Sequence, residues 1–182
     1  MTQMLEFAAG AGAFGDGRHP TTAGVLAALE AIDADAFQPR RAADIGAGSG
    51  ILSLAMVNHF PCHVWAGEMD RQAFETLHEN IQKNGLEARI TPVHACGFDH
   101  PHLQANAPYD LITMNILADP LLALAADAEA ALAPGGALLL SGMLVWQEET
   151  VRIAYRALGL ELASRLTLGE WVTLVFLKPE LA

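Results

Sequence analysis

The residues with the clearest chemical capacity form a glycine-rich turn, D-I-G-A-G-S-G over residues 44–50, between two apolar runs. Glycine at positions 46, 48 and 50 lets the backbone approach a ligand without a Cβ atom in the way, and the amides that open the following helix can receive a negative group. A nicotinamide-binding turn requires the spacing G-x-G-x-x-G. Ile51 occupies the last glycine position of that spacing, so the sequence favours a different ligand.

Two carboxylates accompany this turn. Glu68 ends the next apolar run, where a carboxylate can accept hydrogen bonds from both hydroxyls of a ribose. Asp44 lies within an apolar strand, and it needs hydrogen-bond donors because an unpaired buried carboxylate is costly. Turn amides or a cofactor ammonium would provide these donors, and a purely structural role as a cap of the loop is equally compatible.

Alternating helices and strands are needed to position these groups. Apolar residues at helical spacing predict helices over residues 20–32, 51–59, 73–84, 119–132 and 147–158. Strands are predicted over residues 42–45, 62–67, 89–95, 110–115, 137–141, 160–166 and 171–177. The alternation predicts a mainly parallel α/β sheet with helices on both faces. Only T-L-G-E separates the last two strands, so they must pair as an antiparallel hairpin.

This order of elements is typical of one class of Rossmann-like fold. Dinucleotide-binding domains usually keep the last strand parallel, whereas class I methyltransferases reverse the seventh strand. The turn, Glu68 and the hairpin together predict S-adenosylmethionine as cofactor, with its carboxylate on the helix amides. We expect cofactor contacts at Asp44, Gly46, Gly48 and Glu68.

The composition fits one cytoplasmic domain. The 182 residues are 52% hydrophobic, and we expect residues 1–182 to form a single domain that begins with a loop over residues 1–19. The formal charge of −11 opposes direct binding of nucleic acid, and it suits either a basic protein partner or solubility alone. Two cysteines indicate free thiols in a reducing compartment, and no apolar run has the length of a membrane span.

Four motifs are similar to those of the ribosomal protein L11 methyltransferase family. They are A-F-G-D-G-R-H-P-T-T at residues 13–22, the turn with its following I-L at residues 44–52, N-I-L-A at residues 115–118 and G-E-W-V at residues 169–172. The resemblance extends from about residue 13 to residue 178. It implies a methyltransferase whose substrate is a basic ribosomal protein. The methyl group would go to an amine of that protein, either a lysine or the amino terminus.

The resemblance also implies functional positions. Cofactor contacts are expected at Thr22, Gly46, Glu68 and Asn115, with Phe14 and His19 lining the loop that folds against the cofactor. The family usually has aspartate where this chain has Glu68. Family members also carry an amino-terminal recognition domain, and this chain begins almost at the loop. Either that domain was removed, or the chain is a free-standing relative with another substrate.

Asn115 is the candidate catalytic residue. Methyl transfer requires alignment and desolvation of a deprotonated amine, and the Asn115 side-chain carbonyl can accept N–H bonds from such an amine. Capping of the next helix is the structural alternative for this residue. Trp171 is a candidate wall for the substrate but fits the core better, and His19 fits local hydrogen bonding better than catalysis.

A cluster of zinc-type ligands follows the third predicted strand: His94, Cys96, His100 and His102. We expect no metal there, because the first two share a strand face while the histidines at 100 and 102 lie in a loop. The segment of Cys96, Gly97 and Phe98 is instead expected to border the adenine ring, with Gly97 as a cofactor contact.

Three other functions compete with protein methylation. Without a recognition domain, the chain fits a small-molecule N- or O-methyltransferase. Lone domains of this fold also serve as non-catalytic cofactor-binding modules. A nicotinamide oxidoreductase is the remaining alternative.

Overall fold

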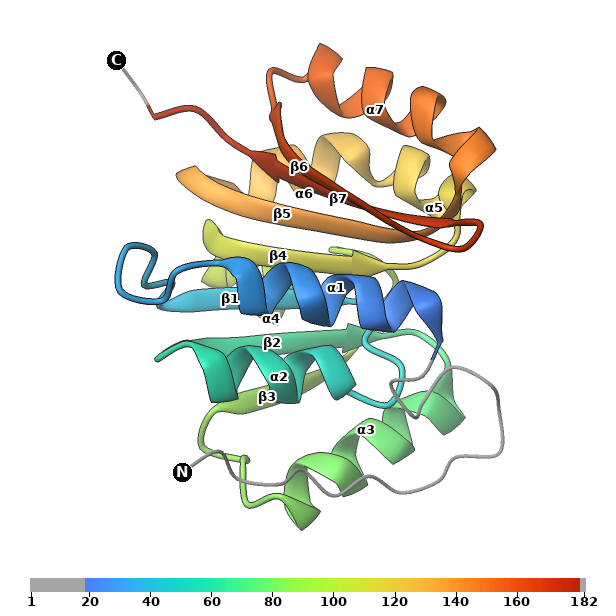
Figure 1. Cartoon of the computed structure of the whole chain (residues 1–182). Helices are drawn as coiled ribbons and strands as arrows, with labels where there is room; N and C mark the ends of the chain where they lie inside the picture. Colours follow the sequence, from blue (N-terminus) through green and yellow to red (C-terminus); the bar gives the residue numbers. More distant parts are fainter. Residues whose placement is uncertain (1–18, 181–182) are drawn as a thin grey trace.

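A computed structural model describes residues 19–180 of the chain (Figure 1). Within these residues, seven strands form one sheet in the order β3-β2-β1-β4-β5-β7-β6. The strands are β1 (Arg41–Ile45), β2 (His63–Glu68), β3 (Ile90–His94), β4 (Tyr109–Asn115), β5 (Leu132–Leu144), β6 (Glu161–Leu168) and β7 (Trp171–Leu177).

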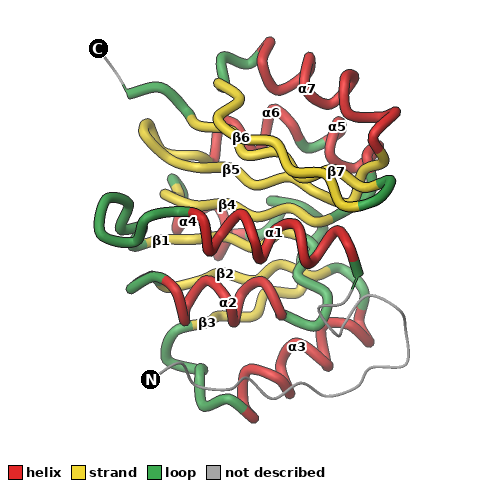
Figure 2. Tube along the Cα trace, viewed as in Figure 1, coloured by secondary structure: helices red, strands yellow, loops and turns green. Residues whose placement is uncertain are grey.

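Helices cover both faces of this sheet (Figure 2). One face carries α1 (Pro20–Ala31), α2 (Ile51–His59) and α3 (Arg71–Lys83), and their apolar side chains form one core with the sheet. The other face carries α4 (Pro101–Asn106), α5 (Ala118–Ala123), α6 (Ala125–Ala131) and α7 (Glu148–Ala157), which form a second core. The predicted α/β class, with helices on both faces, is therefore confirmed.

The predicted terminal hairpin is also confirmed. β7 pairs antiparallel with both β5 and β6, while β1 to β5 pair in parallel. The hairpin turn is shorter than predicted, because Leu168 still pairs with Trp171 and leaves only Gly169 and Glu170 between the strands. Gly169 has a φ of 62°, a conformation that glycine adopts without strain.

Two predicted elements differ in the structure. The helix expected over residues 119–132 is interrupted at Leu124, which separates α5 from α6 and packs its side chain over Gly97. The strand expected over residues 137–141 begins at Leu132 instead. The P-G-G segment at residues 134–136 is part of that strand, and the Gly135 amide donates to the Lys178 carbonyl at 2.8 Å.

Two short helical segments are absent from the predicted elements. α4 begins at Pro101, and the His100 side chain caps it by accepting from the His102 amide at 3.1 Å. A short 3₁₀ helix, η1 (Val145–Gln147), joins β5 to α7. Of the helices within residues 19–180, none combines the length and the apolar character that crossing a membrane requires.

Candidate functional site

The candidate site lies where the strand order changes direction. β1 is paired with both β2 and β4, so the carboxyl ends of the three strands meet at one edge of the sheet (Figure 1). Ligands of open α/β sheets bind at such a switch point. The glycine turn follows β1, Glu68 ends β2 and Asn115 ends β4. The fold therefore brings these predicted groups to the same edge.

The glycine turn has the backbone conformation that its sequence requires. Gly46, Gly48 and Gly50 have φ values of 75°, 57° and 84°. A Cβ atom on Gly46 would lie 2.3 Å from Cγ2 of Ile116, whereas a Cβ atom on Gly48 would meet no atom of residues 19–180 within 4 Å. Gly46 is required by packing, and the backbone of Gly48 is not covered by the described residues. This cradle fits a ligand that approaches the main chain closely.

Glu68 connects the turn to the end of β2. Its side chain is buried, its Oε2 accepts from the Gly48 amide at 2.8 Å and its Oε1 accepts from the Asp70 amide at 2.8 Å. These two bonds orient the carboxylate toward the turn. Each carboxylate oxygen has a second lone pair, so the group retains the capacity to accept two hydroxyl donors.

Asp44 lies beneath the turn with 1% of its surface exposed. We expected turn amides, a cofactor ammonium or a purely structural role as a cap of the loop, and the observed donors are the Ser53 backbone amide and two side-chain hydroxyls. Oδ2 accepts from the Ser53 hydroxyl at 2.6 Å, and Oδ1 accepts from the Thr113 hydroxyl at 2.8 Å. Asp44 thus joins β1 to α2 and β4, which gives it a structural role, and a contact with the cofactor stays a prediction. The hydroxyl partners were missed because they come from elements whose proximity no local pattern reveals.

Burial gives Asp44 an unusual titration. Loss of water raises the pKa of its carboxyl group to about 6, against the lowering effect of the Ser53 and Thr113 hydrogen bonds. The folded state then binds a proton more tightly than the unfolded state, whose pKa is 3.8. Because the folded pKa is the higher one, this group lowers the free energy of unfolding as the pH rises from about 4 to about 6.

We expect Asp44→Asn to remove that pH dependence. The difference in unfolding free energy between wild type and variant should change by about 2.4 kcal/mol between pH 4 and pH 7, with the wild type losing stability relative to the variant. Urea denaturation across this range measures it. Asp127→Asn, which removes an exposed carboxylate on α6, is the control. Parallel curves for wild type and Asp44→Asn would contradict the assignment.

Asn115 and Thr22 face each other across the sheet edge. Nδ2 of Asn115 donates to Oγ1 of Thr22 at 3.3 Å, and Thr22 is buried in α1. This bond fixes the amide so that its carbonyl oxygen is the end left to accept from a ligand. The structural alternative, a side-chain cap of the following helix, does not describe it, because Leu117 is the residue that precedes α5.

His19 and Trp171 form the next layer of the site. The His19 side chain caps α1, with Nδ1 placed 2.8 Å from the Thr21 hydroxyl. Its ring packs edge-on against the Trp171 indole with a centroid distance of 5.0 Å. The half-buried Trp171 therefore reaches the amino end of α1, beside Thr22.

Gly97 follows β3 and lies beside the end of β2. Its carbonyl oxygen is 3.7 Å from where a Cβ atom of Gly67 would stand, and a Cβ atom on Gly97 itself would lie 2.6 Å from Leu124 Cδ2. Cys96 is exposed here. Phe98 belongs to the core that includes Leu103 of α4, and the expected place of this segment beside adenine stays a prediction.

The remaining predicted residues either have structural partners within the described chain or lie outside it. Phe14 and most of the predicted loop over residues 1–19 fall outside the described residues. His94 lies 3.0 Å from the Met69 carbonyl through Nε2, while His100 and His102 belong to α4 and its cap. Between residues 19 and 180, no three His, Cys, Asp or Glu side chains converge as metal ligands.

The sheet order, the reversed hairpin and the position of the turn define the class I methyltransferase fold. The crystal structure of a ribosomal protein L11 methylase from Lactobacillus delbrueckii subsp. bulgaricus superposes with a TM-score of 0.79 at 25% identity, over 90% of this chain and 81% of that one. A precorrin-6y C5,15-methyltransferase from Geobacter metallireducens GS-15 shares the fold, with a TM-score of 0.74 at 16% identity over 96% and 95%.

Sequence comparison identifies the family. The family described as ribosomal protein L11 methyltransferase (PrmA) matches residues 2–179, and this chain belongs to it. Ribosomal protein L11 methyltransferases from Caulobacter sp. (strain K31) and Brucella abortus (strain S19) are 39% and 40% identical over 98% and 89% of the chain. The chain spans 60% and 56% of the length of these two relatives. The predicted family resemblance is confirmed.

Proposed function

We propose that this chain is an S-adenosylmethionine-dependent methyltransferase domain that methylates an amine of a basic protein, a ribosomal protein L11-like substrate. The observation that carries the proposal is the Asn115 amide, held by Thr22 at the edge that also presents the glycine turn and Glu68. Family membership supports the protein substrate, since the relatives are named for ribosomal protein L11. We propose residues 1–182 as one cytoplasmic domain that does not bind nucleic acid directly.

The chain's own residues fit the cofactor. Gly48 provides backbone within the turn, Glu68 provides lone pairs for the ribose hydroxyls, and Gly97, beside the end of β2, is the proposed neighbour of the adenine ring. Gly50 has no side chain to cap α2, and the Ser53 amide bonds to Asp44, so the Ile51 and Leu52 amides are the proposed donors to the methionine carboxylate. When bound, S-adenosylmethionine supplies a methyl group on a sulfonium. We assign Asp44 to the support of the turn and His19 to the wall of the site.

Asn115 positions the accepting amine. Its Oδ1 accepts an N–H of the neutral amine, which directs the nitrogen lone pair toward the donor carbon. A lysine must first lose its proton, and the partly apolar rim that includes Trp171 favours the neutral form. The sulfonium is already an activated methyl donor, so the reaction needs little acid–base catalysis. The lysine ammonium therefore loses its proton to solvent before the amine attacks.

Calorimetry and methyl transfer test this function. The purified protein should bind S-adenosylhomocysteine and not NAD, and it should transfer labelled methyl groups to ribosomal protein L11. Binding of NAD alone would overturn the proposal. Transfer only to a metabolite pool would favour a small-molecule methyltransferase, and binding without transfer to any acceptor would favour a non-catalytic module.

We expect Glu68→Gln to weaken S-adenosylhomocysteine binding about 30-fold, which corresponds to about 2 kcal/mol for a lost charged hydrogen bond. The glutamine NH₂ group would also face the Gly48 or Asp70 amide, both of which are donors. Calorimetry measures the affinity. Glu79→Gln on α3 removes the same charge from an exposed position and should bind as the wild type does. Equal affinities for all three proteins would exclude Glu68 from the cofactor site.

A further inference from the structure

Three exposed apolar residues follow the carboxyl ends of β4 and β5. Leu117, Val145 and Trp146, which we name the Trp146 platform, are 65%, 41% and 76% exposed. A tryptophan this exposed leaves its indole face open to solvent, which is unfavourable unless a partner covers it. The platform is therefore a candidate contact surface.

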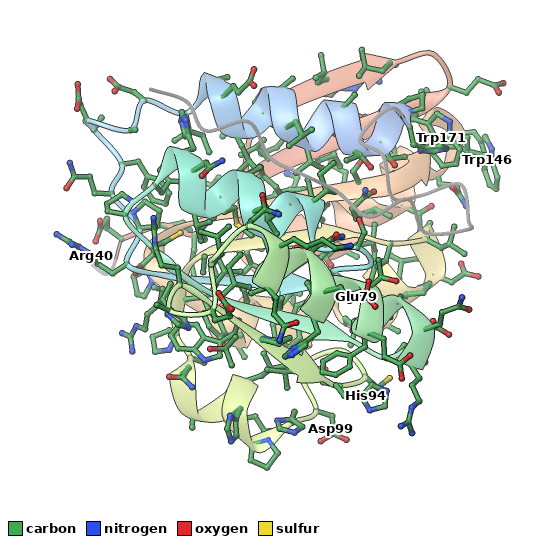
Figure 3. The ribbon with its side chains drawn as sticks, turned by 90° about the horizontal axis from the view of Figure 1, so that it is seen from below. Arg40, Glu79, His94, Asp99, Trp146 and Trp171 are labelled. Atoms are coloured by element: carbon green, nitrogen blue, oxygen red, sulfur yellow. The ribbon has the colours of Figure 1, made fainter. Side chains whose placement is uncertain are left out.

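The platform is held in place beside the proposed site. The Val145 amide donates to the Glu170 carbonyl at 2.9 Å, and Leu144 pairs with Trp171 across the β5–β7 ladder. Figure 3 shows Trp146 and Trp171 next to each other at one end of the molecule. Since Trp171 contacts His19 at the start of α1, the platform extends the rim of the site outward.

The 3₁₀ segment that carries Trp146 is fixed by its own hydrogen bonds. The Gln147 side-chain oxygen accepts from the Leu144 amide at 2.9 Å, and the Glu148 carboxylate receives two bonds of 2.7 Å from Arg165 on β6. The indole is thus displayed by an anchored backbone, so a partner would meet a surface that needs little ordering on binding.

The charges around the platform are acidic. Exposed Asp119 follows Leu117 by two residues, exposed Glu170 accepts from the Val145 amide, and no ion pair within residues 19–180 engages either carboxylate. The nearby arginines are neutralised, because Arg152 pairs with Glu149 and Arg165 pairs with Glu148. A tryptophan face with acidic neighbours is the arrangement that binds a lysine or arginine side chain.

We infer that the Trp146 platform docks a basic polypeptide segment of the protein substrate, one that flanks the amine to be methylated. A cation of that segment lies over the indole, and the net charge of −11 attracts it. The inference rests on the proposed function. It states that Trp146, which does not contact the reacting amine, contributes to the affinity for the protein substrate. The platform thereby favours a protein over a small amine.

Steady-state methylation of ribosomal protein L11 tests the docking role. Trp146→Ala should raise KM for L11 about tenfold while kcat and S-adenosylhomocysteine affinity stay within about twofold of wild type. Trp146→Phe should retain most of the affinity, because it keeps an aromatic face. Ile153→Ala on α7 is the control, because it removes another exposed apolar side chain, 59% exposed. Its KM for L11 should match that of the wild type. An unchanged KM for Trp146→Ala would overturn the inference.

Equilibrium binding separates this inference from the proposed function. Calorimetric titration of wild type with L11 in the presence of S-adenosylhomocysteine should show binding that Trp146→Ala weakens about tenfold. If the wild type transfers no methyl group but shows this difference, the proposed function fails and docking stands. Equal L11 binding by both proteins overturns docking. So does sedimentation that shows a wild-type dimer and a Trp146→Ala monomer, since a second copy would then be the occupant.

Discussion

Asn115→Ala is expected to lower kcat for methyl transfer about 100-fold while S-adenosylhomocysteine affinity falls no more than about threefold. The substitution removes the oxygen that orients the accepting amine, and it leaves the glycine turn and Glu68 in place. Asn115 is half-buried at the end of β4, and its Nδ2 is engaged by Thr22 at 3.3 Å. Its contribution is therefore to alignment of the reacting nitrogen rather than to cofactor binding.

Single-turnover kinetics with L11 and calorimetry with S-adenosylhomocysteine measure these two effects separately. Asn106→Ala removes the same side chain from α4, where its amide donates to the His102 carbonyl at 2.7 Å, and should retain full activity. Thermal unfolding of both variants checks that they are folded. An Asn115→Ala enzyme with wild-type kcat would remove Asn115 from the catalytic machinery and favour the non-catalytic alternative.

Gly142→Ala should be the most destabilising of the substitutions considered. Gly142 follows Ser141, the last β5 residue paired with β4, and it has a φ of 89°. A Cβ atom there would lie 2.2 Å from the Ile116 carbonyl oxygen and 2.9 Å from the Ile116 nitrogen. Both atoms belong to backbone, so relief requires movement of the segment that follows Asn115. We expect a loss of about 4 kcal/mol in unfolding free energy, from left-handed strain plus overpacking.

Gly159→Ala provides a matched control for this prediction. Its φ of 88° imposes the same strain, while a Cβ atom there would meet no atom of the described chain within 4 Å. We expect a loss of about 1 kcal/mol for this variant, measured by urea denaturation at pH 7. Gly142→Ala should also depress methyl transfer, because Ile116 adjoins Asn115. If the two alanine variants were equally stable, the close approach of Gly142 to residue 116 would make no contribution to the free energy of unfolding.

The order of elements follows from the sequence alone, because hydrophobic period and turn composition are local properties. The glycine turn between a strand and a helix was visible in residues 44–50, and the hairpin was required by two strand-like runs too close for a crossover. Glu68 and Asn115 fall at strand ends for the same reason. Parallel pairing then places them at one edge without further information.

The partners across the fold were decided by tertiary structure. Thr113 is 69 residues from Asp44, and nothing in the hydrophobic pattern predicts that its hydroxyl completes the support of that carboxylate. The helix breaks at Leu124, whose side chain packs over Gly97, and the continuous helical pattern did not predict either feature. Trp146 reaches the rim of the site only because η1 is bonded to the β6–β7 turn. Spacing along the chain determines which residues end the strands, whereas the contacts between elements determine what those residues touch.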